Sequence, residues 1–185
     1  MTLEDLLSRL APALEHANLP YMLTGSVASS AHGLPRSTRD LDIVIAPTRA
    51  QLLTLIQQFP NAHYYVDEAQ ALQALANKSQ FNIIDFATGW KVDFIIAEDS
   101  EYGRTALMRR SRINIAGNFV HVASAEDVVI AKLRWAKLSG SDRQLQDAAG
   151  IVSVQGSNLD VEYVERWVSE LRLEQQWRAV REAPR

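Results

Sequence analysis

The sequence contains no cysteine, and this absence narrows the chemistry that the chain can use. Without cysteine there are no disulfides and no thiolate metal sites, so a bound metal would need oxygen or nitrogen ligands. The absence also fits a reducing compartment, and we expect a cytoplasmic protein.

Long apolar runs and an excess of basic residues are also missing. No run approaches the roughly 18 residues that a membrane span needs, so we expect no membrane partner. The first residues, MTLEDLLSRL, carry acids early and no basic segment, which predicts that they are not a secretory signal. Lys and Arg number 19 against 22 Asp and Glu, and this net charge of −3 does not indicate nucleic-acid binding.

The stretch 21–45, YMLTGSVASSAHGLPRSTRDLDIVI, holds the first candidate site. A short apolar run precedes Gly25 and Ser26, and a helical segment of small residues, Val27 to His32, follows them. Glycine permits a tight turn, and the free N–H groups at a helix start attract phosphate. The Gly-Ser pair therefore indicates either a phosphate cradle or an ordinary helix cap.

Two acids stand at the start of an alternating strand pattern, Asp40 to Ile45. Residues i and i+2 of a strand project from the same face, so Asp40 and Asp42 lie side by side. Their like charges repel, and a divalent cation would remove that repulsion; hard oxygen ligands suit Mg²⁺ or Mn²⁺. The alternative is a strand that begins at a solvated edge.

A third acid occurs in the segment FNIIDFATGWKVDFII. Two β-rich runs, Phe81 to Phe86 and Lys91 to Ile96, flank a predicted hairpin turn. Asp85 stands in the first run and Asp93 in the second, and a charge inside such a strand is costly unless it is paired or bound to metal. We prefer Asp93, because its run is the more continuously apolar, and keep Asp85 as the alternative.

Gly25-Ser26, then Asp40-x-Asp42, then Asp93 on a later strand resembles the pattern of the DNA polymerase β-like nucleotidyltransferase superfamily. The resemblance covers roughly residues 5–150, with a slightly long spacer between the first two motifs. The motif Arg36-x-Thr38-x-Asp40 resembles the corresponding motif in the branch that includes toxins of type IV toxin–antitoxin (abortive infection) systems.

The resemblance implies catalysis with two metal ions, Mg²⁺ or Mn²⁺, and a nucleoside triphosphate, with ATP as a candidate. Asp40 and Asp42 would hold both ions, and Asp93 would be a further ligand and a possible proton acceptor. The predicted reaction transfers a nucleoside monophosphate to a hydroxyl of an RNA, a protein or a small molecule and releases pyrophosphate. The chain could serve as a toxin with an antitoxin partner; the alternative is a non-catalytic nucleotide-sensing or protein-binding module with the same fold.

The resemblance also implies the residues that bind the nucleotide. Gly25 and Ser26 would hold the terminal phosphates, and Arg36 would clamp a phosphate or else pair with a nearby acid. Lys132 would contact the triphosphate, and Asp147 would orient it. By charge alone Lys137 is an equal candidate, since a lysine on an amphipathic helix is usually at the surface, and the same helix predicts Trp135 in the core.

The predicted fold is α/β (α+β): a mixed, twisted sheet with flanking helices, followed by a helical C-terminal part. We expect a nucleotidyltransferase core over residues 1–123 and a helical part over 124–185, packed together as one unit. Pro12 predicts a kink or break in a first helix over residues 2–17. Residues 181–185 are predicted to fray.

Overall fold

A computed structural model of the chain describes residues 2–183, and these residues divide into two compact units. The first, the sheet unit, takes in the chain up to Leu23 together with Thr38–Val122. The second, the helical unit, takes in Thr24–Ser37 together with the chain from Ala123 onward. Thr24–Ser37 thus groups with the C-terminal helices, and the predicted core over residues 1–123 with a helical part over 124–185 stays a prediction.

A mixed sheet of seven strands forms the centre of the sheet unit, with the order β3-β4-β5-β2-β1-β7-β6. In chain order the strands are β1 (Tyr21–Thr24), β2 (Asp40–Ile45), β3 (Tyr64–Tyr65), β4 (Gln80–Asp85), β5 (Lys91–Ile96), β6 (Ser111–Ile115) and β7 (Asn118–Val122). β2 runs parallel to β5 and β1 parallel to β7, whereas the hairpins β4–β5 and β6–β7 are antiparallel. The strand predictions for the three acids therefore hold, and β6 lies at an edge.

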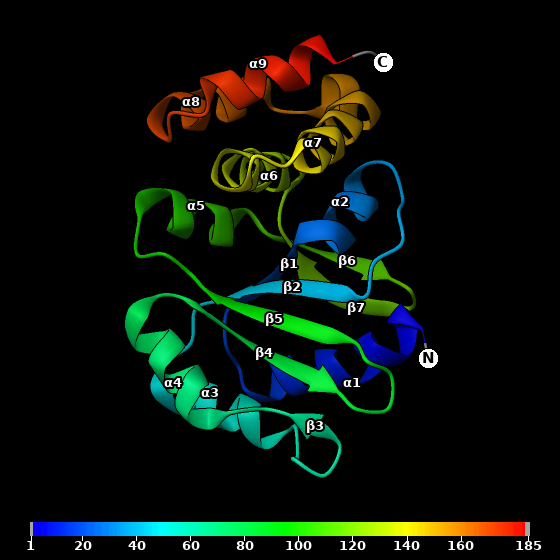
Figure 1. Cartoon of the computed structure of the whole chain (residues 1–185), viewed down its shortest axis with the longest axis vertical. Coiled ribbons are helices and arrows are strands. Elements are labelled where there is room, and N and C mark those ends of the chain that lie inside the picture. Colours follow the sequence, from blue (N-terminus) through cyan, green and yellow to red (C-terminus); the bar gives the residue numbers. More distant parts are fainter. Residues whose placement is uncertain (1, 184–185) are drawn as a thin grey trace. The chain divides into compact units, whose positions relative to one another are not determined.

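One face of this sheet is packed against helices. Leu41, Ile43 and Ile45 point into it and are fully buried, as the alternation of β2 predicts. The helices α1 (Leu3–His16), α3 (Arg49–Gln57) and α4 (Glu68–Asn77) lie together on one side of β2, β5 and β4 (Figure 1). Leu6 and Leu10 of α1 share a small enclosed space with Ile83 and Val92, so α1 packs on this face. The sheet unit also contains α5 (Glu101–Arg109).

The helical unit consists of α2 and the helices after β7. In chain order they are α2 (Gly25–His32), α6 (Ala125–Ser139), α7 (Asp142–Gln155), the 3₁₀ helix Gly156–Asn158, α8 (Val161–Glu170) and α9 (Glu174–Glu182). α6 and α7 pack on each other, and α2 packs on both of them. α8 and α9 pack in turn on these longer helices (Figure 1). The short α2 thus gains its tertiary contacts from partners about a hundred residues later in the chain.

The fold class is confirmed, and the departures from the sequence predictions are local. α1 continues through Pro12 without ending there, and Thr2 and Asp5 form the capping box at its start. Trp135 was predicted in the core, but 49% of its side chain is exposed. α9 extends to Glu182, so the first residues of the predicted frayed tail are helical, and residues 184–185 lie outside the described part. Among residues 2–183 no helix is both long and apolar enough to cross a bilayer.

Candidate functional site

The register of β2 against β5 brings the three predicted acids to one face of the sheet. Asp40 is paired with Lys91 and Asp42 with Asp93. Paired residues of neighbouring strands point the same way, as do residues i and i+2 of one strand. These four side chains, which we call the carboxylate array, therefore project from the face opposite Leu41 and the packed helices.

Inside the array, Lys91 is bonded to Asp93. Lys91 Nζ donates a hydrogen bond to Asp93 Oδ2 over 2.7 Å. The pKa of Lys91 is raised above its ordinary value, first by this hydrogen bond and then by the negative charges of Asp93, Asp40 and Asp42, which outweigh its burial. The ammonium group thus interacts electrostatically with all three carboxylates and is hydrogen-bonded to that of Asp93.

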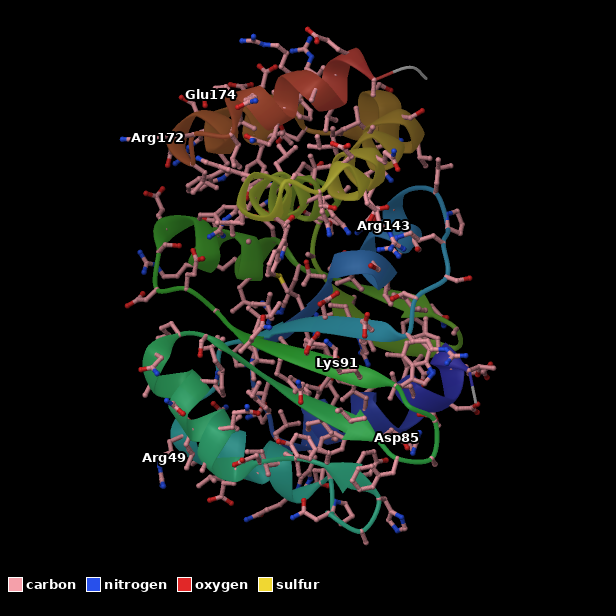
Figure 2. The ribbon with its side chains drawn as sticks, viewed as in Figure 1. Arg49, Asp85, Lys91, Arg143, Arg172 and Glu174 are labelled. Carbon is pink, nitrogen blue, oxygen red and sulfur yellow. The ribbon has the colours of Figure 1, made fainter. Side chains whose placement is uncertain are left out.

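Asp85, the alternative third acid, points to the opposite face. Asn82 is paired with Asp93 across β4 and β5, so Asp85, three residues later, has the other parity. Arg9 of α1 donates to its Oδ2 over 2.6 Å, and the backbone N–H of Ala87 donates to its Oδ1 over 2.9 Å. Figure 2 shows Asp85 at the end of β4 and Lys91 on β5. Asp85 is therefore separated from Asp40 and Asp42 by the sheet.

The donors of the carboxylate array suit a hard divalent cation, because three carboxylates project from one face of β2 and β5. In this arrangement the carboxylates are not closed around a common point: among residues 2–183 no group of three or more His, Cys, Asp or Glu is gathered closely enough to hold a metal ion. Asp93 is engaged instead by Lys91. The array fits Mg²⁺ or Mn²⁺ in ligand type, with its three carboxylates on one face of the sheet.

The helical unit contains the second group of predicted residues. α2 begins at Gly25, whose φ of +63° lies in the left-handed region that favours glycine. Ser26 follows in the first turn, and its hydroxyl accepts a hydrogen bond from Arg36 Nη2. The Gly-Ser prediction of a tight turn into a helix start thus agrees with the backbone, and a guanidinium group lies at that start.

The basic side chains of this second group, Arg36 and Lys132, share Asp147 as an acceptor. Asp147 Oδ2 accepts from Lys132 Nζ over 2.7 Å and from Arg36 Nε over 3.3 Å. The Lys132 side chain is only 4% exposed, although a lone lysine on an amphipathic helix is usually at the surface. Ser26, Arg36, Lys132 and Asp147 form one hydrogen-bonded cluster, which we call the Arg36 cluster.

The loop that carries Arg36 is fixed to α7. A side chain at Gly33 would come within 2.9 Å of the backbone nitrogen of Ile151, so only glycine allows this close approach. Gln155 donates to the carbonyl of His32 over 2.6 Å, and Ser30 accepts from the Arg36 backbone over 3.2 Å. The position of Arg36 is therefore set by α2 and α7.

Sequence reasoning missed two neighbours of the acids, Lys91 and Asn82. Lys91 stands two residues before Asp93, and the period-two rule of strands already places it on the same face. Asn82 joins that face through its pairing with Asp93, which depends on the register of the β4–β5 hairpin. The first could have been predicted from spacing, whereas the second required the turn geometry.

Comparison with solved structures gives matches over most of the chain. A crystal structure of ANT(2'')-Ia in complex with adenylyl-2''-tobramycin is similar with a TM-score of 0.59 and 14% identity, covering 98% of each chain. The lincosamide antibiotic adenylyltransferase LnuA, lincomycin-bound, gives a TM-score of 0.57 and 15% identity, covering 83% of this chain and 98% of that one. An antigenic nucleotidyltransferase-like protein from Paracoccidioides brasiliensis gives 0.56 and 17%, covering 97% and 92%. No family model matches the sequence, and neither does any curated protein.

At these identities the similarity shows the fold, which is that of the nucleotidyltransferases. It agrees with the superfamily that the Gly-Ser and Asp-x-Asp motifs resemble. The narrower resemblance to abortive-infection toxins stays a prediction.

Proposed function

We propose that this protein is a metal-dependent nucleotidyltransferase that transfers a nucleoside monophosphate from a nucleoside triphosphate to a hydroxyl group. The observation that carries the proposal is the placement of Asp40, Asp42 and Asp93 on one face of adjacent central strands, in a chain with the nucleotidyltransferase fold. A non-catalytic nucleotide-sensing module would have no need for three acids placed together in this way, because their mutual repulsion costs stability.

The carboxylate array supplies the ligands for Mg²⁺ or Mn²⁺ in this proposal. Asp40 and Asp42 extend from successive outward positions of β2, and Asp93 stands beside Asp42 on β5. When bound, the metal neutralises phosphate charge and lowers the pKa of the acceptor hydroxyl. Asp93 is the carboxylate that takes the hydroxyl proton.

The Arg36 cluster supplies the phosphate contacts. The N–H groups of the first turn of α2 and the Ser26 hydroxyl hold phosphate oxygens, and the Arg36 guanidinium binds them as a charged donor. Lys132 is buried and bonded to Asp147, so we assign Asp147 to holding Arg36 in place and Lys132 to adding positive charge.

The bond changes are those of a simple displacement. The acceptor oxygen forms a bond to the α-phosphorus while the bond from that phosphorus to the bridging oxygen of the β-phosphate breaks, and pyrophosphate leaves. The hydroxyl proton passes to Asp93. Little covalent chemistry is asked of the protein, whose part is positioning and charge stabilisation.

A small-molecule hydroxyl is the acceptor that we favour. Two of the similar structures are named for adenylyl transfer to antibiotics, and one of them matches this chain over 98% of both lengths. By the same reasoning ATP is the nucleotide to try first. An RNA or protein acceptor, with a toxin role and an antitoxin partner, is the prediction that follows from the branch resemblance instead.

The test is metal-dependent nucleotide binding followed by turnover. Each of the four common triphosphates is titrated with Mg²⁺ into the wild type and into Asp40→Asn/Asp42→Asn, and pyrophosphate release is then measured with hydroxyl-bearing small molecules, RNA and protein. We expect binding that needs the metal and disappears in the double variant. Asp85→Asn, which removes a carboxylate from the opposite face, is the matched control and should bind as the wild type does. Unchanged binding in the double variant would contradict the proposal.

A further inference from the structure

Lys91 occupies an unusual place for a basic residue, because it lies within the carboxylate array itself. Its Cα is paired with that of Asp40, and its Nζ is bonded to Asp93. The ammonium group therefore holds a carboxylate that a divalent cation would also use. This inference rests on the proposed function, since it concerns how the same array receives its metal.

The side chain of Lys91 is the part of this ion pair that can move to make room for a metal ion. β5 is hydrogen-bonded between β2 and β4, so neither Lys91 nor Asp93 can shift along the sheet. The Asp93 side chain is 13% exposed and the Lys91 side chain 39% exposed. A flexible chain of four methylenes that is already partly in solvent can swing outward, whereas the short aspartate side chain remains where the strand places it.

A divalent ion and the ammonium group cannot both sit close to Asp93. Two cations at one carboxylate repel each other, and the array offers three negative charges to share between them. The Lys91 ammonium occupies this position in the structure, 2.7 Å from Asp93 Oδ2.

The ion pair between Arg9 and Asp85, on the other face of the sheet, is a useful comparison because its base has more than one partner. Arg9 is held by two partners, since its Nη1 donates to Tyr64 Oη over 2.8 Å and its Nη2 to Asp85 over 2.6 Å. The hydrogen bond of the Lys91 ammonium goes to Asp93, the residue that the metal requires. Lys91 is thus the more readily displaced of the two bases.

We propose that Lys91 is a tethered cation that competes with the divalent ion for Asp93, so that the array binds a free ion weakly and fills when the ion arrives with a nucleotide. Lys91 is in this sense a positioning residue that acts through Asp93. It keeps the three carboxylates from repelling one another until the metal–nucleotide complex displaces it. The phosphate oxygens of the nucleotide then supply the remaining ligands of the ion.

The test is a titration with Mn²⁺ in the absence of nucleotide. Binding is measured as the loss of the electron paramagnetic resonance signal of free Mn²⁺. We compare the wild type with Lys91→Met and with Lys78→Met, a matched loss of one positive charge at an exposed lysine elsewhere in the sheet unit. An opposite charge within a few ångströms changes the proton affinity of a carboxylate by about one to three powers of ten, so we expect Lys91→Met to bind Mn²⁺ about tenfold or more tightly. Lys78→Met should bind as the wild type does.

Two further variants show whether Lys91 acts through Asp93. In the Asp93→Asn background the added substitution Lys91→Met should change Mn²⁺ affinity by less than about twofold, because the shared carboxylate is gone. Lys91→Gln removes the charge but keeps a hydrogen-bond donor, and it should also tighten binding. A merely structural role for Lys91 would loosen the array and weaken binding in both variants.

The outcomes separate this inference from the proposed function. Equal or weaker Mn²⁺ binding in Lys91→Met and Lys91→Gln, with ATP binding still lost in Asp40→Asn/Asp42→Asn, overturns the role of Lys91 and leaves the metal site standing. Weaker binding of ATP with Mn²⁺ in Lys91→Met would show that the lysine contacts the triphosphate, which also overturns it. No Mn²⁺ binding by any variant, with or without ATP, overturns both.

Discussion

Asp85 and Asp93 stand on adjacent strands of one sheet, and each is bonded to a basic side chain, yet their surroundings differ. Asp85 is 3% exposed and receives hydrogen bonds from Arg9 and from the backbone of Ala87. Burial alone would raise the pKa of Asp85, but these hydrogen bonds outweigh it, and the pKa lies below its ordinary value. On the other face, Asp93 shares one lysine with two further carboxylates.

The difference in surroundings indicates a structural role for Asp85 and a functional role for Asp93. The charge of Asp85 is matched by one arginine inside the protein, and that pair needs no ligand. The carboxylate array places three carboxylates on one face of β2 and β5, and hard oxygen ligands of this kind suit a divalent cation from outside. An acid buried in a strand is therefore informative about function only when the charge around it is counted.

The largest expected effect is that of Asp42→Asn. Metal at a transferring phosphate contributes several kcal/mol to the transition state, and each 1.4 kcal/mol is a factor of about ten in rate, so pyrophosphate release should fall about a thousandfold. The fold should persist, since Asp42 lies on the face away from the packed core. Thermal unfolding followed by circular dichroism checks the second point. A variant that keeps its turnover would remove the distinction between the two faces.

The Arg36 cluster extends the comparison, because in it two basic side chains, Arg36 and Lys132, donate to one carboxylate, Asp147. A hydrogen bond to a charged group contributes about 1.5–3 kcal/mol, so Arg36→Gln should weaken binding of ATP with Mg²⁺ by about 10- to 100-fold. Arg143→Gln, at an exposed position on α7, is the control (Figure 2). Isothermal titration of both variants measures the effect, and equal affinities would place the phosphates elsewhere.

For Asp85→Asn we expect a change in stability and none in nucleotide binding. At pH 7 the free energy of unfolding should fall by about 2 kcal/mol, because a charged hydrogen bond to a buried carboxylate is lost. The lowered pKa means that ionised Asp85 stabilises the fold above its unfolded-state pKa of about 4, and that this stabilisation is lost as pH falls through the folded-state pKa. Urea unfolding of both proteins should therefore show a difference that shrinks on acidification; a growing difference would contradict the assignment.

The smallest effect is expected from Arg9→Lys. Arginine reaches Tyr64 and Asp85 with two different nitrogens, and lysine has only one, so about 1 kcal/mol of stability should be lost. Arg49→Lys, at an exposed position at the start of α3, should change stability by no more than about 0.5 kcal/mol (Figure 2). If the two substitutions cost the same, the Arg9 pair is no more than a surface contact.

Local patterns predicted the elements that carry the acids. The alternation from Asp40 to Ile45 predicts the strand with its bounds, because this signal depends on neighbours a few residues apart. The pairing of Asp42 with Asp93 is different in kind. It depends on β5 lying beside β2 rather than at an edge, and spacing along the chain does not contain that information.

α6 shows where helix patterns fail. Its sequence predicts Trp135 inside and Lys132 at the surface, and the structure has them the other way round, with Lys132 buried against Asp147. Hydrophobicity predicts burial for each residue from its own side chain. Which face of α6 is covered depends instead on where α7 packs on it. The acid that makes a buried lysine acceptable comes from that second helix.

The grouping of Thr24–Ser37 with the late helices has a consequence for how the chain is made. α2 is synthesised about 90 residues before α6 begins and about 120 residues before α7 is complete, and these are the helices it packs on. The sheet unit can complete its strands at Val122, while the early helix must wait for the last third of the message to be translated. A gene cut after Val122 would therefore encode all the strands together with an α2 that has no helices to pack on. A fragment beginning at Ala123 would contain α6 and α7 without α2. Mixing the two fragments would bring α2 and its partner helices together again.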